Sequence, residues 1–480
     1  MRVRVADRGV VLQMAAKATS RPEGRPRPER NLGEAEQGRA LNRKPLPGRL
    51  AWVKEAAERS RQTRFTALLH HVDDEALARA FGRLKRRAAP GVDGMTVADY
   101  EQGLAERLRE LCERVHSGRY RPQPVRRTYI PKADGGQRPL GVLALEDKTL
   151  QGAVAEVLSA IYEADFLDCS YGFRPGRNAH QALRAVHDAI MTERVNWVLE
   201  ADIRKFFDSV DHGWLLRMMA QRIADPQILR LISLWLRAGI LEDAVFSDTV
   251  EGTPQGAGIS PLLANIFLHY ALDLWVAQWR RRQATGPMRL VRYADDFVLT
   301  FQRRADAQAM AAALADRLAK FGLRLHEGKT RLVEFGRFAE ADRRQRGETR
   351  PATFDFLGLT HYCGKTRDGR FMAKCRTQRQ RKIRKLKELR QEMRRRMHRP
   401  LGEQQQWLSS VLRGHYAYYG ITGNYRSLAV FFGQVLEGWI RALRRRGQRP
   451  HLPWERFHRI LKAFPLPEPR IVHDWRACTA

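Results

Sequence analysis

The stretch "LVRYADDFVL", residues 290–299, places two adjacent carboxylates, Asp295 and Asp296, inside an otherwise apolar run. Burying an ionised carboxylate without a partner is strongly unfavourable, so these two either face a positive charge or stand at a turn that faces water. The flanking runs "MRLVRYA" and "DFVLTF" favour β-strands, which predicts a hairpin with the acidic pair at its tip. Taken alone, such a tip is equally compatible with a harmless surface turn.

A second acidic strand end is predicted near residue 202. "WVLEADIRKFFDSV", residues 197–210, is another β-favouring run, and Asp202 lies where it gives way to a turn and a helix. Two acidic strand ends brought together form a site of hard oxygen ligands that suits two Mg²⁺ ions. Two such ions can activate an attacking 3′-hydroxyl and stabilise a leaving pyrophosphate. The acidic strand ends that carry Asp202, Asp295 and Asp296 therefore predict nucleotidyl transfer.

The overall composition points to a polyanionic partner. The chain of 480 residues carries 86 Lys and Arg against 53 Asp and Glu, a net charge of +33, which favours nucleic acid as the partner. Its five cysteines form no C-x-x-C pair, which argues against a zinc site or a disulfide framework. The most apolar run, residues 261–279, contains Asn265, His269 and Asp273 and is typical of a core helix rather than a membrane span.

Composition and periodicity divide the chain into three parts. Residues 1–50 are rich in Pro, Arg and Gly, which predicts a basic, disordered leader. In residues 51–365 helical and strand patterns alternate irregularly, which indicates the α+β class. Residues 366–480 begin with a cationic helix-forming run and continue with aromatic residues at helical spacing, most of which we expect in a core. The predicted strands are residues 126–132, 197–203, 288–294, 296–301 and 331–335.

Seven motifs, in order along the chain, resemble those of reverse transcriptases. Tyr-Ala-Asp-Asp at 293–296 resembles the catalytic box of that family, and Asp202 with "FFD" resembles its first acidic motif. The fingers hairpin is resembled by "YIPKADGGQRPLGV" (129–142), and a signature of the group II intron branch by "DCSYGFRPGRNAHQAL" (168–183). The third motif of the family is resembled by "GTPQGAGISPLLANI" (252–266). The primer-grip hairpin is resembled by "FDFLGL" (354–359), and the maturase domain by "RGHYAYYG" (413–420).

The resemblance implies a right-hand polymerase, with palm and fingers in residues 51–365 and a helical thumb and helical maturase-like RNA-binding domain in residues 366–480. It implies an RNA-directed DNA polymerase of a group II intron that also binds intron RNA and assists its splicing and mobility. The expected partners are group II intron RNA, an RNA template with a DNA primer, target DNA and dNTPs. The expected location is the cytoplasm, in association with the nucleoid, with no membrane segment or signal peptide. The final residues "RIVHDWRACTA" lack cysteine pairs, so we expect a member without the HNH endonuclease.

The same resemblance assigns roles to individual residues. Asp202, Ile203, Asp295 and Asp296 are the expected ligands of two Mg²⁺ ions, with Mn²⁺ as an alternative. Phe207 matches the aromatic gate that excludes a 2′-hydroxyl, although an ordinary core phenylalanine looks the same in sequence. Lys329 matches a proton donor to pyrophosphate, against the alternative of a surface lysine. The expected contacts to the dNTP are Lys132, Arg138, Phe207, Gln255, Gly256 and Lys329, and those to nucleic acid are Arg376, Arg381, Lys382, Lys385, Arg413 and Arg426.

Two alternative functions remain open from the sequence. A host-adopted reverse transcriptase acting in defence or repair would keep the same active site. A maturase acting mainly by RNA binding would not need that site. The residues present at the expected positions favour an active polymerase instead: Asp202, Asp295, Asp296, Gln255 and Lys132.

Overall fold

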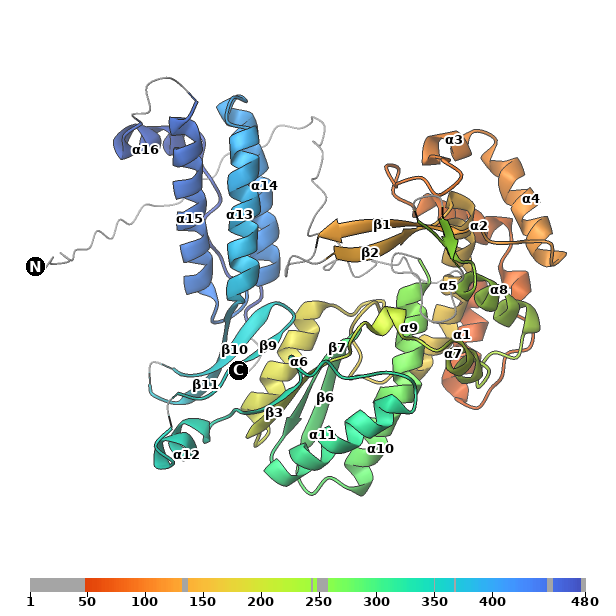
Figure 1. Cartoon of the computed structure of the whole chain (residues 1–480), viewed down its shortest axis with the longest axis horizontal. Coiled ribbons are helices and arrows are strands. Elements are labelled where there is room, and N and C mark those ends of the chain that lie inside the picture. Colours follow the sequence, from red (N-terminus) through yellow and green to blue (C-terminus); the bar gives the residue numbers. More distant parts are fainter. Residues whose placement is uncertain are drawn as a thin grey trace, which may run out of the picture. The chain divides into compact units, whose positions relative to one another are not determined.

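The computed structural model of the chain, shown in Figure 1, describes residues 48–131, 137–242, 245–247, 258–348, 350–366, 368–446 and 452–475. The predicted leader, residues 1–50, lies outside the described residues except for Gly48–Leu50, which form a 3-10 turn. Helices are mixed with three sheets in the described residues, which confirms the predicted α+β class. The proposed domain boundaries at residues 50 and 365 stay a prediction.

The N-terminal part of the described chain is mainly helical. The long helix α5 (Leu145–Asp165) lies against α1 (Ala51–Arg59) and α2 (Asp74–Gly82), and α2 also contacts α4 (Leu104–His116), which follows α3 (Val97–Glu101). The apolar residues of α5 are buried almost all round, as expected for a central helix.

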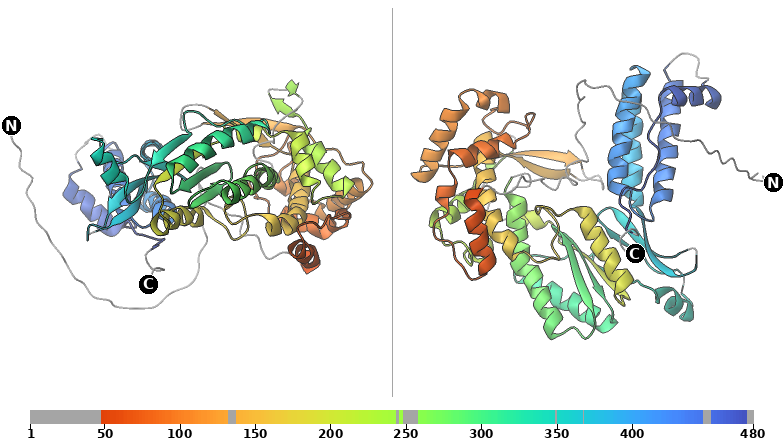
Figure 2. Two further views of the ribbon diagram at one scale, coloured as in Figure 1. Left: turned by 90° about the horizontal axis from the view of Figure 1, so that it is seen from below. Right: turned by 180° about the vertical axis from the view of Figure 1, so that it is seen from behind.

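The central sheet has four antiparallel strands in the order β6-β7-β3-β8. Its strands are β3 (Trp197–Asp202), β6 (Met288–Tyr293), β7 (Asp296–Phe301) and β8 (Arg331–Glu334), which confirms four of the five predicted strands. Alternate residues face opposite sides. One face packs on α6 (Ala179–Thr192) and the other on α11 (Arg304–Ala319), and Figures 1 and 2 show these helices on opposite sides of the sheet.

Other strands of the described chain form two further sheets. The first has the order β2-β1-β4-β5, in which β1 (Val125–Pro131) pairs antiparallel with β2 (Gln137–Val142) and parallel with β4 (Ile240–Glu242), and β5 (Val245–Ser247) completes it. Strand β1 confirms the remaining predicted strand. The second has the order β11-β10-β9, formed by β9 (Phe354–Phe356), β10 (Leu359–Lys365) and β11 (Phe371–Thr377).

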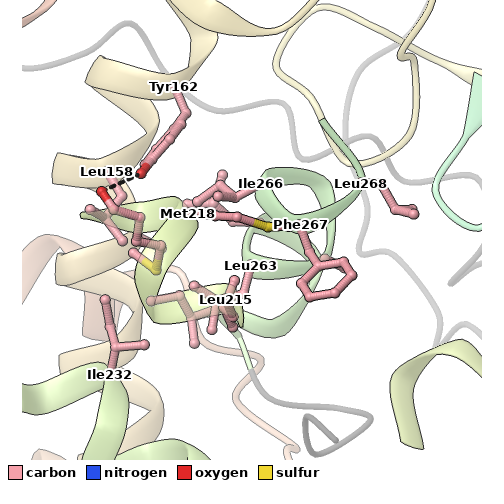
Figure 3. Packing of buried hydrophobic residues seen from close by; sticks show 14 of the residues in the cluster. Leu158, Tyr162, Leu215, Met218, Ile232, Leu263, Ile266, Phe267 and Leu268 are labelled. Carbon is pink, nitrogen blue, oxygen red and sulfur yellow. Dashed lines mark hydrogen bonds between the residues drawn. The ribbon is translucent and has the colours of Figure 1, made fainter. Parts of the chain in front are cut away.

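The largest described core joins helices that are far apart in the sequence. Figure 3 shows Leu158 and Tyr162 of α5 among residues of α7 (His212–Met219), α8 (Pro226–Leu236) and α9 (Ser260–Leu268). The Tyr162 hydroxyl donates to the carbonyl oxygen of Met219 at 3.3 Å, which satisfies its polar end inside the core. Helix α9 continues through a π-helical turn, His269–Asp273, into α10 (Leu274–Arg282). The predicted core helix over residues 261–279 is therefore confirmed, and no described helix combines the length and apolarity that crossing a membrane requires.

The C-terminal part of the described chain is helical after β11. It contains α13 (Arg379–Arg395), α14 (Leu401–Tyr419), α15 (Tyr425–Arg444) and α16 (Trp454–Ala463), while the short α12 (Ala339–Gln345) precedes β9. These four C-terminal helices, drawn in shades of blue in Figure 1, contribute to a separate apolar core. His415 and Tyr416 are buried in it and Tyr425 is 55% exposed, so the prediction that most aromatics here are core is confirmed.

Candidate active site

The acidic residues of the two predicted strand ends lie next to each other. Strand β3 ends at Asp202, β7 begins at Asp296, and the antiparallel register pairs these two residues directly. Tyr293 pairs with Asp296 across β6 and β7, so Ala294 and Asp295 form a two-residue hairpin turn. The predicted hairpin tip is therefore confirmed, and the three aspartates come from two adjacent strand ends of one sheet.

The hairpin turn that carries Asp295 has an unusual backbone. Ala294 has φ 58°, in the left-handed region, whereas Asp295 is not among the residues with positive φ. Positive φ at the first central residue alone is the pattern of a type II′ turn, where glycine is the usual residue. An alanine in this conformation costs about 1–2 kcal/mol relative to the right-handed region. The turn is therefore maintained by contacts with the rest of the fold.

A buried arginine supplies the main contact. Arg292 is 0% exposed, and all five N–H donors that a guanidinium carries are used. Its Nε and one terminal nitrogen donate to the two carboxylate oxygens of Asp273, at 2.8 and 2.5 Å. The remaining donors reach Ser170 Oγ at 2.8 Å, Asn265 Oδ1 at 2.9 Å and the carbonyl oxygen of Ala294 at 3.0 Å. Arg292 thus ties the turn to the π-helical segment that contains Asp273.

The block "DCSYGFRPGRNAHQAL" packs directly behind the same turn. The backbone of Arg292 exchanges hydrogen bonds with Cys169 and Tyr171, each at 2.8 Å. Asn265 Nδ2 donates to the carbonyl oxygen of Gly172 at 2.7 Å. A Cβ atom on Gly172 would overlap the backbone nitrogen of Ala294, so only glycine fits this close approach. This motif therefore packs against and supports the hairpin that carries Asp295 and Asp296.

The carboxylates influence one another electrostatically. Burial, followed by the negative charges of Asp295 and Asp202, raises the pKa of Asp296 to about 7, although the Leu357 N–H and Arg381 act in the opposite direction. Close carboxylates of like charge disfavour ionisation together, and a bound cation would relieve that repulsion.

Lys329 lies at the site through a second chain segment. Its Nζ is 2.5 Å from Oδ2 of Asp202. The loop that carries Lys329 is pinned to the end of β3, because the His326 N–H donates to the Asp202 carbonyl oxygen at 2.8 Å and Ile203 forms a β-bridge with Leu325. Ile203 itself is buried between these contacts.

The donor set fits magnesium chemistry. Mg²⁺ prefers carboxylate and carbonyl oxygens, and in nucleotide-handling sites one or two carboxylates hold it together with water and substrate phosphates. Within the described ranges, no group of three or more His, Cys, Asp or Glu side chains is arranged to hold an ion by itself. The paired Asp202 and Asp296, with Asp295 in the adjoining turn, match the partial protein shell that such sites use, completed by the substrate.

The predicted dNTP contacts are placed in part. Phe207 lies in the 3-10 turn Phe206–Asp208 that follows Asp202, half-buried, with its ring 5.4 Å from that of Phe206. The backbone of Arg138 pairs with Ile130 in the β1–β2 hairpin. Lys132, Gln255 and Gly256 lie outside the described residues.

The predicted nucleic-acid contacts fall into separate groups. The guanidinium of Arg376 lies 5.6 Å from the ring centre of Tyr362. Burial raises the pKa of Tyr362, and the positive charges of Arg376 and Arg426 partly oppose that rise. Arg381 lies beside Gly358, and its positive charge partly opposes the rise of the Asp296 pKa. The three others are Lys382 and Lys385 on α13 and the exposed Arg413 on α14. Burial lowers the pKa of His415, and the positive charges of Lys385 and Lys382 lower it further.

The supporting residues Arg292, Asp273 and Ser170 were not singled out from the sequence as functional. A signal was present, because Asn265 and Asp273 interrupt an apolar helix where a buried polar group needs a partner. What the sequence could not indicate was that the partner is the arginine two residues before Ala294.

The comparisons with known proteins agree with this geometry. Residues 130–361 match the protein family described as reverse transcriptase (RNA-dependent DNA polymerase). Protein YkfC of Escherichia coli (strain K12) is 35% identical over 273 residues, which cover 51% of this chain and 72% of that protein. The chain belongs to the reverse transcriptase family. As a reverse transcriptase it is an RNA-directed DNA polymerase by class.

Other relatives of this reverse transcriptase are intron-encoded. Group II intron-encoded protein LtrA of Lactococcus lactis subsp. cremoris is 42% identical over 178 residues, which cover 37% of this chain and 29% of LtrA. An uncharacterized 91 kDa protein in the cob intron of Schizosaccharomyces pombe is 35% identical over 190 residues, 40% of this chain and 23% of that protein. The chain therefore spans less than a third of these two relatives, and the resemblance to group II intron reverse transcriptases is confirmed.

Proposed function

We propose that this reverse transcriptase is encoded by a group II intron, copies RNA into DNA, and binds its intron RNA to assist splicing and mobility. The observation that carries the polymerase part is the direct pairing of Asp202 with Asp296 at adjacent strand ends, with Asp295 in the adjoining turn. The name of LtrA, a group II intron-encoded protein that shares 42% identity over 178 residues, supports the intron part.

In this proposal the carboxylates of Asp202, Asp295 and Asp296 and the backbone of Ile203 would hold two Mg²⁺ ions, or Mn²⁺ in their place, and these would activate the primer 3′-hydroxyl. The charge that develops on the leaving pyrophosphate would be stabilised by the same ions. The new bond joins the 3′-oxygen to the α-phosphorus of the dNTP, and the bond from that phosphorus to pyrophosphate breaks. The residues of the chain bind and orient the reactants around this exchange.

Each proposed dNTP contact has a distinct task. Lys132 and Arg138 neutralise the triphosphate from the β1–β2 hairpin, and Gln255 and Gly256 contact the incoming nucleotide. The Phe207 ring blocks a 2′-hydroxyl and so favours dNTPs over rNTPs. Lys329 transfers a proton from Nζ to the leaving pyrophosphate, a role supported by the position of Nζ beside Asp202.

The proposed nucleic-acid surface lies mainly on the C-terminal helices. We assign the palm and fingers to residues 51–365, and the thumb and maturase-like domain to residues 366–480. Template, primer, target DNA and intron RNA would be held through phosphate contacts, which give affinity without sequence choice. The contacts proposed are Arg376, Arg381, Lys382, Lys385, Arg413 and Arg426, and the proposed location is the nucleoid in the cytoplasm.

A primer-extension experiment tests the catalytic assignment. Asp202→Asn and Asp295→Asn should each abolish Mg²⁺-dependent cDNA synthesis on a primed RNA while RNA binding is retained, because each variant removes a carboxylate charge without removing its shape. Asp208→Asn is the matched control, since Asp208 is an exposed aspartate six residues after Asp202. Robust synthesis by either active-site variant would refute the assignment.

The intron assignment needs a different measurement. Sequencing the RNA that co-purifies with the protein from its own cells should recover one structured RNA with lariat junctions. A heterogeneous RNA pool without such junctions would instead indicate a host-adopted reverse transcriptase.

A further inference from the structure

A hydrogen bond connects the C-terminal helices to the β9–β10 turn. Tyr418, in the last turn of α14, donates from its hydroxyl to the carbonyl oxygen of Leu357 at 3.0 Å, across 61 residues of sequence. Leu357 and Gly358 form the two-residue turn of this hairpin, with φ 49° and 80°. Positive φ at both central residues is the pattern of a type I′ turn. A leucine in the left-handed region is strained and persists only where its surroundings hold it there.

The same turn also contacts the catalytic carboxylates. Strand β9, which ends one residue before Leu357, contacts β7, which begins at Asp296. The backbone N–H of Leu357 donates to the carboxylate of Asp296 and partly offsets the rise of the Asp296 pKa that burial and the neighbouring carboxylates cause. Gly358 lies against Arg381 of α13, because a Cβ atom on this glycine would be 2.9 Å from a terminal guanidinium nitrogen. The Leu357–Gly358 turn therefore lies between the first turn of α13, the last turn of α14 and Asp296.

Tyr418 is itself held in place by helix α6. The ring of His180, on α6, is 5.5 Å from the Tyr418 ring, and its Nε2 is 2.8 Å from the Tyr418 carbonyl oxygen. Burial raises the pKa of the Tyr418 hydroxyl well above its usual range, so the hydroxyl remains protonated and able to donate. Because the Tyr418 side chain is fixed in this way, its hydroxyl restrains the Leu357 carbonyl group to which it donates.

We propose that Tyr418 is a positioning residue for polymerisation. Its hydroxyl holds Leu357 in the left-handed conformation that directs the Leu357 N–H at Asp296, and so links the helical C-terminal region to the catalytic carboxylates. The proposal rests on the proposed catalytic role of Asp296. It goes beyond that role by making a residue of the RNA-binding region necessary for the rate of DNA synthesis.

The test compares two tyrosine hydroxyls of one helix. Tyr418→Phe should lower kcat for cDNA synthesis on a primed RNA about 5- to 10-fold, the effect of one lost hydrogen bond to an active-site turn, with the KM for dNTP within about twofold. Tyr416→Phe is the matched control, since the Tyr416 hydroxyl donates to the Pro467 carbonyl oxygen at 3.2 Å, away from the Leu357–Gly358 turn. This control should keep kcat within about twofold of the wild type.

A rescue experiment separates positioning from general destabilisation. Glycine adopts positive φ without strain, so adding Leu357→Gly to Tyr418→Phe should recover most of the lost kcat even though the Leu357 side chain, 8% exposed, is lost from the core. Equal kcat values for the two tyrosine variants, or no recovery in the double variant, would overturn the proposal. The proposed function itself fails under different results. These are a wild-type protein that shows no Mg²⁺-dependent cDNA synthesis, or an Asp295→Asn variant that still shows it.

Discussion

Removing the carboxylate of Asp273 is the most direct perturbation of the hairpin that carries Asp295 and Asp296. Arg292 and Asp273 are both 0% exposed in their side chains, and the carboxylate accepts two of the five guanidinium hydrogen bonds. Asp273→Ala leaves a buried cation with two donors unpaired. Breaking a buried pair in this way costs about 3–5 kcal/mol.

The expected loss is large enough for a simple thermal assay. At about 2–4 °C per kcal/mol for a cooperative unit of 150–250 residues, Asp273→Ala should lower Tm by roughly 6–20 °C. Glu437→Ala is the control, because Glu437 pairs at 3.4 Å with Arg441 where the two side chains are 49% and 67% exposed. That exposed pair contributes about 0–1 kcal/mol. Hydrogen exchange of the β6 and β7 amides would localise the effect.

A double variant distinguishes stability from positioning. Arg292→Met with Asp273→Leu removes both charges, so much of the lost stability should return. The Ala294 carbonyl oxygen still loses its Arg292 donor, and cDNA synthesis should stay impaired. A Tm change for Asp273→Ala no larger than that of Glu437→Ala would refute the reasoning about the buried pair.

Three further predictions concern single residues. Gly172→Ala should strongly reduce cDNA synthesis in primer extension, because its Cβ would overlap the Ala294 backbone. Its control is Gly414→Ala, where the added Cβ meets open space, and thermal unfolding should show a free energy of unfolding about 0.5–1 kcal/mol higher. Burial lowers the pKa of His361 to about 3. The unfolded chain therefore binds the proton first as pH falls below about 6.5, and wild-type stability should drop by about 2 kcal/mol more than that of His361→Phe between pH 7 and pH 5 in urea unfolding. Phe207→Val should admit rNTPs in primer extension with defined nucleotides, and unchanged sugar selectivity would identify Phe207 as a core residue only.

Much of the active-site geometry followed from local sequence. The strand ends at Asp202 and Asp296 were predictable, since a strongly β-favouring run on each side leaves few places for the turn. The contribution of Arg292 was not, because its four partner residues lie on segments up to 122 residues away and its own neighbours in sequence are ordinary strand residues. Likewise, "RGHYAYYG" indicated a helix with aromatic core residues, and the contact of Tyr418 with Leu357 depends on packing that periodicity does not contain.

The complete donor set of Arg292 also affects how the protein behaves in salt. Counterion release at exposed Lys and Arg makes nucleic-acid affinity fall steeply as salt rises, with a slope set by the phosphates contacted. Arg292 contributes nothing to that slope, because its donors are all used internally and mobile ions screen a buried pair only weakly. A concentrated salt wash should therefore remove bound RNA while the hairpin that carries Asp295 and Asp296 keeps its shape. Native RNA partners consequently have to be crosslinked before such a wash, and the stripped protein should resume synthesis when the salt is diluted.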